Sequence, residues 1–160
     1  VYSRNTKEIN DRDAILYGTK WKVRRKRMQE RHLCRAKRID NGEWVEGFYF
    51  SMTHPDGRHT HHFIIPLGAD LSLGTAIEKI QVEIDPSTIC QCTGLKDKNG
   101  KLIWENDIVK DNVIYGVVKW DDANAEYIID DREDGYQDYS EWWHEVEVIG
   151  SVIDTPKLLE

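Results

Sequence analysis

Histidine and cysteine side chains give this sequence its clearest candidate for chemistry. A nine-residue segment contains four histidines, namely His54, His59, His61 and His62. The segment Cys90-Gln91-Cys92 places two thiols on one face of a strand, and zinc accepts two ligands of each kind. However, Cys-x-Cys is not the usual Cys-x-x-Cys spacing, and no pattern brings the two segments together. We therefore predict no metal or other cofactor, and the zinc alternative rests on His59, His61, Cys90 and Cys92.

Motifs for catalysis occur only as near misses. Five residues separate Gly94 from Gly100, where a phosphate-binding loop has four, and Leu102 occupies the position of the magnesium-binding Ser or Thr. No nucleophile elbow, metalloprotease helix, dinucleotide fingerprint or EF-hand loop is present. The adjacent acids at 121–122 and 130–131 are typical of turn caps that face solvent. We therefore predict that the protein is not an enzyme, and we assign no catalytic residue.

Positive charge is concentrated near the amino terminus. Between Lys20 and Arg38 the chain has ten Lys or Arg and the single acid Glu30. Such an arm can neutralise nucleic-acid phosphates, with an affinity that falls steeply as salt rises. The candidate nucleic-acid-binding residues are Lys20, Lys22, Arg24, Arg25, Lys26 and Arg27. The alternative, which we favour, is a solvated leader beside a strand whose outer face is basic.

Negative charge is concentrated in the other half of the chain. Residues 105–160 contain sixteen Asp or Glu and four Lys or Arg, a net charge of −12, whereas residues 1–104 carry +5. This asymmetry can join copies of the chain in an oligomer, steer the protein to a basic partner or imitate a phosphate backbone. Solubility is its simplest explanation.

Composition places the protein among soluble intracellular proteins. The 160 residues suffice for one domain or two small ones, and the charged fraction of 32% is ordinary. No apolar run approaches the ~20 residues of a membrane helix, and no secretory leader is visible. Three cysteines, an odd number, indicate reduced thiols. We expect a cytoplasmic protein that does not contact membranes.

The segment 93–110 organises the expected fold. Asp97-Lys98-Asn99-Gly100 predicts a type I′ hairpin turn, because Asn and Gly accept the positive φ that this turn requires. Leu102, Ile103 and Trp104 then begin the return strand. The polar pair Asn106-Asp107 interrupts the apolar run, so we expect the chain to bend there before the next strand.

Strands are predicted on both sides of this hairpin. Upstream, residues 34–50 form a hairpin around Asn41-Gly42, the turn 54–57 adds a third strand, and 80–84 alternates as a further strand. Downstream, strands at 115–120 and 126–129 and a closing strand at 146–153 favour an SH3-like barrel. We predict that Trp104 and Trp120 belong to its core.

Shorter elements are expected near the carboxyl end. Residues 139–144 can form one helical turn capped by Ser140, which would bury one of Trp142 and Trp143. Residues 156–160 favour an irregular or 3₁₀ ending, with Leu158 and Leu159 packed as a plug.

Four blocks of sequence resemble the YopX family of phage and prophage proteins. They are CRAKRIDNGEWVEGFYF at 34–50, TGLKDKNGK with the later DIV within 93–110, GVVKWDD at 116–122 and EVIGSVIDTPKLLE at 147–160. The resemblance covers about Met28 to Glu160 and implies a small, mostly β, phage-associated protein without an established activity. The sequence departs from the family at Asn106, where a glycine usually precedes Asp-Ile-Val; Asn also accepts positive φ, so we expect the turn to be kept.

Together these observations predict a mostly β protein in three regions. Residues 1–27 form a basic extension that can be helical, 28–92 a β-hairpin and meander region, and 93–160 a small SH3-like β-barrel. The function ranked first is a non-enzymatic protein-interaction or structural module, which binds a host or phage protein in the bacterial cytoplasm and can form a homo-oligomer. The alternative is a nucleic-acid-binding module that uses the basic arm. A small zinc-binding protein is the second alternative.

Overall fold

Antiparallel strands dominate the structure. The computed structural model describes residues 30–69, 76–113, 115–131, 135–137 and 143–160, and the predicted extension 1–27 lies outside them. Within the described ranges the regular elements are eleven strands and three 3₁₀ helices, η1 (Ile77–Lys79), η2 (Pro86–Thr88) and η3 (Pro156–Leu159). The mostly β prediction is therefore confirmed. No helix of this part is both long and apolar enough to span a bilayer.

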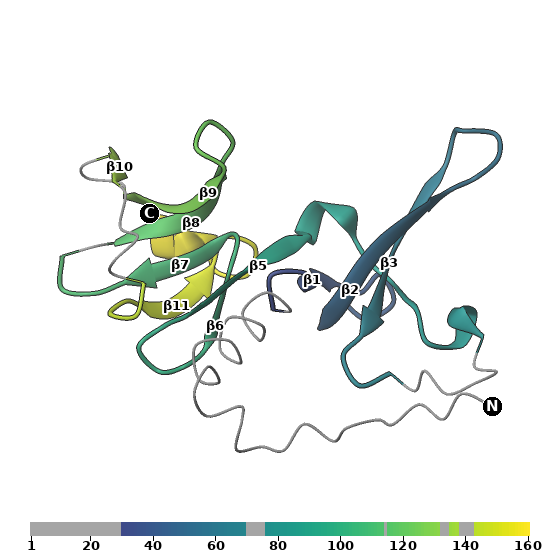
Figure 1. Ribbon diagram of the computed structural model, residues 1–160, viewed down its shortest axis with the longest axis horizontal. Helices are drawn as coiled ribbons and strands as arrows, with labels where there is room; N and C mark the ends of the chain where they lie inside the picture. Colours follow the sequence, from purple (N-terminus) through teal and green to yellow (C-terminus); the bar gives the residue numbers. More distant parts are fainter. Residues whose placement is uncertain (1–29, 70–75, 114, 132–134, 138–142) are drawn as a thin grey trace, which may run out of the picture.

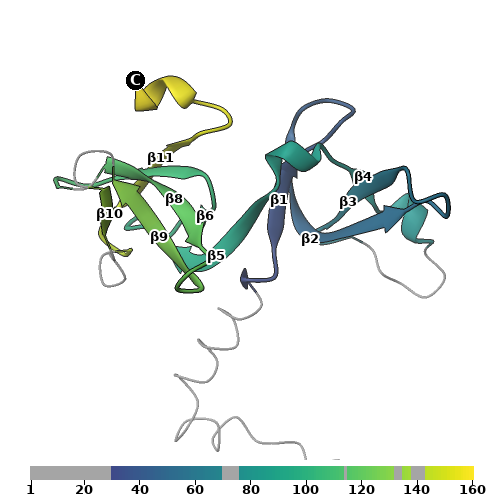
Figure 2. The same ribbon diagram turned by 90° about the horizontal axis from the view of Figure 1, so that it is seen from above.

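The first sheet has the strand order β4-β3-β2-β1-β5-β6 (Figures 1 and 2). Its strands are β1 (Cys34–Lys37), β2 (Trp44–Thr53), β3 (Thr60–Pro66), β4 (Val82–Glu83), β5 (Cys90–Lys96) and β6 (Leu102–Trp104). The expected meander of β1, β2 and β3 is confirmed, because each strand pairs antiparallel with the next. The strand expected at 80–84 is shorter than predicted, and only β4 with an isolated bridge at Ile84 remains.

The second sheet has the order β10-β9-β8-β7-β11. Its strands are β7 (Asp107–Lys110), β8 (Tyr115–Asp121), β9 (Glu126–Asp131), β10 (Gly135–Gln137) and β11 (Glu147–Ser151). The strands expected between 107 and 153 are therefore confirmed. The sheet is open, with β10 and β11 as its two edges, so a closed barrel is not formed and the SH3-like assignment stays a prediction.

Strand β5 connects the two halves of the molecule. Its first residues pair with β1 (Cys34 opposite Gln91), and its later ones pair with β6. The register shifts between Cys92 and Lys96, where Gly94 has a φ of +74° and Thr93 Oγ1 donates to the carbonyl of Ile103 at 2.8 Å. This bulge bends β5 as it passes from one group of strands to the other (Figures 1 and 2).

Both predicted Asn-Gly hairpins exist, but their turns are not type I′. Gly42 and Gly100 have positive φ, whereas the non-glycine residues with positive φ in the described ranges are Asn106 and Ala125. Asn41 and Asn99 therefore lack the φ that a type I′ turn requires. At the second hairpin the Asp97 carboxylate accepts from the Asn99 and Lys101 amides at 2.8 and 2.9 Å, which fixes a longer loop that ends in one left-handed glycine. Asn106, at φ +65°, confirms the predicted turn before β7.

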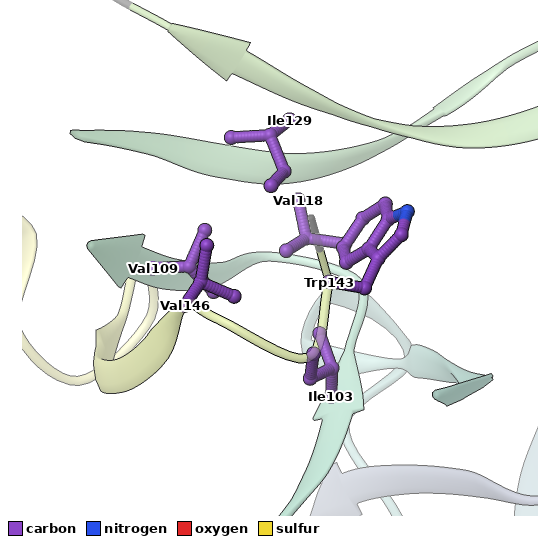
Figure 3. Packing of buried hydrophobic residues seen from close by; sticks show 6 residues of the cluster. All are labelled: Ile103, Val109, Val118, Ile129, Trp143 and Val146. Atoms are coloured by element: carbon purple, nitrogen blue, oxygen red, sulfur yellow. The ribbon is translucent and has the colours of Figure 1, made fainter. Parts of the chain in front are cut away.

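Three clusters of buried residues fill the two halves. The largest, shown in Figure 3, comprises Ile103, Val109, Val118, Ile129, Trp143 and Val146. A second lies in the first sheet around Ala36, Ile64 and Ile84. A third, where β5 and β6 meet the segment before β1, contains Leu33, Cys90, Cys92 and Trp104. Trp104 is thus buried as predicted, although its cluster is not that of the second sheet.

Three predictions near the carboxyl end have different outcomes. Trp143 is buried, as expected for one of the two adjacent tryptophans. The predicted helical turn at 139–144 lies largely outside the described residues. The 3₁₀ ending is confirmed, but Leu158 is 40% exposed and Leu159 is only partly buried, so the two do not form a packed plug.

A buried ion pair joins the two sheets. Arg35 of β1 contacts the Asp107 carboxylate at the start of β7, and Asp107 Oδ2 also accepts from the Trp104 amide at 2.9 Å. The Arg35 guanidinium lies over the rings of Trp44 and Trp104, at 4.8 and 5.4 Å from their centroids. This arrangement positions the second sheet against β1.

Candidate functional site

A groove of about 470 Å³ lies beside the β8–β9 hairpin. Its walls come from three places: residues 31–32 before β1, residues 91–93 and 95 of β5, and residues 120 and 125–127 of the hairpin, with Trp143 at its base. The volume falls in the range of about 300–1,000 Å³ that is typical of ligand sites. It is larger than the cavity of about 220 Å³ beside Arg38 and Gln81, and we take it as the candidate site.

Strand register explains why the groove is aromatic. Val118 of β8 lies opposite Ile129 of β9, and two residues along each strand Trp120 lies opposite Tyr127. Both pairs face the same side, because side chains alternate along a strand. Trp143 covers the first pair (Figure 3), whereas the second pair extends beyond this cover. The groove is therefore the place where the core face of the sheet emerges into solvent.

The exposed tryptophan is held in one position. Trp120 is 43% exposed, so the prediction that it belongs to the core is wrong. Its Nε1 donates to Asp122 Oδ1 at 2.9 Å, and its ring meets Tyr127 edge-on at 5.0 Å and 70°. The hairpin is stiffened in turn because Asp121 accepts from the Ala123 amide and the Asn124 side chain. Trp120 thus offers an apolar surface whose conformation is already fixed, which lowers the entropic cost of binding.

The charges around the groove differ between its sides. Arg31 and His32 line the groove from the segment before β1, and Glu126 lines it from the hairpin, with Asp122 nearby in the turn beside Trp120. Burial, and after it the charge of Glu105, raises the pKa of Tyr127, while Arg31 acts in the opposite direction. Tyr127 therefore keeps a neutral hydroxyl at physiological pH. The groove combines an uncharged aromatic floor with a basic and an acidic side.

The cysteine at the back of the groove is chemically inert. Burial raises the pKa of Cys92 to about 11, and the Gly94 amide lies 3.4 Å from its sulfur. A thiol with this pKa is protonated at neutral pH, and the thiolate is the form that attacks substrates or binds metals. Cys92 consequently acts as a small core residue here.

Comparison with known protein families shows to which family the chain belongs. The family model described as YopX protein matches residues 20–160. The chain belongs to the YopX family. The match begins before Met28, where the resemblance was expected to start, so the arm residues from Lys20 to Arg27 lie within it. A comparison with curated proteins found no match.

The structure of this YopX-family chain does not gather the candidate metal ligands. His59 and His61 are exposed on the β2–β3 hairpin, where His61 Nδ1 is 2.8 Å from Glu83 Oε1. Cys90 and Cys92 are buried in β5. Across the described ranges no group of three or more His, Cys, Asp or Glu is arranged to hold a metal ion. His61 stacks instead on Phe63, and His62 on Tyr49.

The basic segment of the YopX-family chain divides into two parts. The nucleic-acid candidates Lys20, Lys22, Arg24, Arg25, Lys26 and Arg27 all lie outside the described residues, so the arm stays a prediction. Of its later basic residues, Arg31 lines the groove and three others are paired with acids: Arg35 with Asp107, Lys37 with Asp154, and Arg38 with Asp40. Much of the charge in β1 thus stabilises the fold.

Sequence reasoning missed the groove, although one signal pointed to it. Trp120 is the last apolar residue of its strand and is followed at once by Asp121, which ends the strand, and the turn residue Asp122. A large apolar side chain at this position lies at the end of the sheet, where cover from other elements is least. Arg31 and His32 gave no comparable signal, because they reach the groove only through the pairing of β1 with β5.

Proposed function

We propose that this YopX-family protein is a non-enzymatic protein-interaction module that binds a segment of another protein in the groove beside Trp120. One observation carries the proposal: a 43% exposed tryptophan that two neighbours hold in place. Tryptophan, tyrosine and arginine dominate binding energy at protein interfaces, and Trp120, Tyr127 and Arg31 supply one of each.

Packing around the groove supports the same proposal. Leu95 of β5 and Ile103 of β6 pack into the core of the second sheet, so the β5–β6 hairpin lies across the sheet's inner face. An incompletely closed SH3-like barrel would have this arrangement, and SH3 domains bind extended segments in grooves lined by aromatic side chains. We further propose, from the family's association with phages and prophages, a host or phage protein in the bacterial cytoplasm as the partner.

Site-directed photo-crosslinking in the producing bacterium tests the proposal. A photoreactive phenylalanine analogue replaces Gln91, an exposed residue of the groove wall, or Phe48, an exposed residue of β2 in the other half of the molecule. We expect position 91 to capture a defined protein that position 48 does not capture. Trp120→Ala should abolish this product. A product that persists in Trp120→Ala, or none from position 91, would overturn the proposal, and a product made of two copies of the chain would identify self-association.

The two alternatives remain predictions from the sequence. The basic arm lies outside the described residues, and the histidines and cysteines lie on separate elements. Glu126 in the groove and Asp122 beside it would repel phosphates, which favours protein over nucleic acid there.

A further inference from the structure

We infer that the segment bound in this groove is short and basic, with one large apolar side chain seated on Trp120 and Lys or Arg residues beside the β8–β9 hairpin. This inference rests on the proposed function and adds the chemistry of the partner. It is carried by the floor of the groove and by the charges of its two sides.

The floor determines the apolar part of the partner. Trp120 and Tyr127 form its outer portion, and Leu95 and Trp143 continue it to the packed core. A cavity of about 470 Å³ holds a few side chains and is too small for a folded domain. An aromatic or large aliphatic side chain fits this floor, because it would cover the exposed face of Trp120 and remove both apolar surfaces from water.

The charges determine the residues that flank this anchor. Glu126 lines the groove, Asp121 and Asp122 lie at the turn beside Trp120, and the stretch 120–127 contains no Lys or Arg. This stretch lies within the region 105–160, whose net charge is −12. A basic segment is therefore attracted over a distance and meets complementary charge at the hairpin.

Arg31 orients the segment. It lines the groove from the segment before β1, and its charge acts to lower the pKa of Tyr127. Lys or Arg side chains would be repelled there and attracted at the hairpin. A bound segment therefore places its basic residues on one side of the apolar anchor rather than on both.

Selection from a display library of random peptides tests the inference without knowledge of the natural partner. The full chain and three variants are screened in parallel: Trp120→Ala, Glu126→Lys and the control Glu78→Lys. Glu78 is an exposed acid of η1, outside the groove. Circular dichroism and urea unfolding of each variant first establish that it is folded.

The expected result is a set of peptides that share one aromatic or large aliphatic residue with an excess of Lys and Arg on one side of it. Trp120→Ala should retain none of them. Glu126→Lys should weaken binding of a selected synthetic peptide about tenfold and reduce the basic excess, whereas Glu78→Lys should change neither. Binding to the unmodified chain should weaken as salt rises.

The outcomes separate this inference from the proposed function. Peptides that need Trp120 but show no basic excess, or an acidic one, overturn the inference and leave the interaction groove standing. Peptides whose binding is unaffected by Glu126→Lys also overturn it. If no peptide depends on Trp120, the proposed function fails and the inference fails with it.

Discussion

Two tryptophans of similar sequence context differ in burial, and this difference should be measurable in stability. Trp104 is 2% exposed in a packed cluster, whereas Trp120 is 43% exposed. We expect Trp104→Ala to lower the free energy of unfolding by about 3–5 kcal/mol. Trp120→Ala loses mainly its contact with Tyr127 and should cost about 1 kcal/mol. Urea unfolding of both variants measures the two costs, and a larger cost at Trp120 would contradict its placement.

A single carboxylate should contribute to acid sensitivity. Asp97 is buried, and hydrogen bonds from the amides of Asn99, Lys101 and Val148 lower its pKa against the opposing effect of burial. Because the folded-state pKa lies below the unfolded value of about 3.9, the stabilisation is complete above that pH and is lost as the pH falls through the folded-state pKa.

Asp97→Asn should therefore show a shallower loss of stability below about pH 4 than the unmodified chain. Urea midpoints at a series of pH values measure this slope. The exposed acid Glu78, changed to Gln, serves as the control. Parallel pH profiles for Asp97→Asn and the unmodified chain would refute the proposed role of this carboxylate.

At the scale of elements, the period-two pattern predicted strands well but not the burial of side chains at their ends. Every strand of β7 to β9 was expected from its apolar residues, and β8 does put Val118 and Trp120 on one face. The alternation of apolar and polar residues predicts on which face of the sheet a side chain lies. It does not predict how far along the strand other elements cover that face. That limit depends on Leu95 and Trp143, which reach the sheet from other parts of the chain. Exposure of Trp120 could therefore not be predicted locally.

Close contact between β2 and β3 makes Gly47 a sensitive position. A Cβ atom at Gly47 would lie 1.9 Å from the Ile65 carbonyl oxygen and 2.9 Å from the Ile64 side chain. Gly47→Ala should force the two strands apart and destabilise the fold by about 3 kcal/mol. Ser51→Ala, at an exposed position of the same strand, should cost less than about 0.5 kcal/mol. Equal urea midpoints for the two variants would show that the strands can adjust.

At the scale of the whole molecule, the contact between the sheets depends on charge. Arg35 and Asp107 are both largely buried, and the Asp107 carboxylate also accepts a hydrogen bond from the Trp104 amide. Asp107→Ala leaves the guanidinium without its acid and should cost about 3–5 kcal/mol. Lys119→Ala removes a pair with Asp130 that is half exposed, so its cost should stay below about 1 kcal/mol. Thermal unfolding compares the two variants. Similar losses of stability would show that the buried pair contributes no more than the exposed one.

The Arg35–Asp107 contact between the sheets also shows which part of the whole molecule could not be predicted from the sequence alone. Turn residues and apolar alternation predicted the hairpins, because they act over a few residues. Arg35 and Asp107 are far apart along the chain, and Arg35 was counted only as one of ten basic residues. The groove shares this limitation, since its walls include residues 31–32 and residues 120 and 125–127.

The position of β5 has a consequence for the order in which the chain folds. The hairpin of β1 and β2 can form as soon as it leaves the ribosome. The other edge of β1 remains unpaired until β5 has been synthesised and Gln91 can pair with Cys34. Bringing these strands together requires closing a long loop, which slows folding. During this interval the unpaired edge of β1 can associate with strands of other chains. We therefore expect chains truncated before β5 to aggregate during synthesis, and chains that extend through β6 to aggregate less.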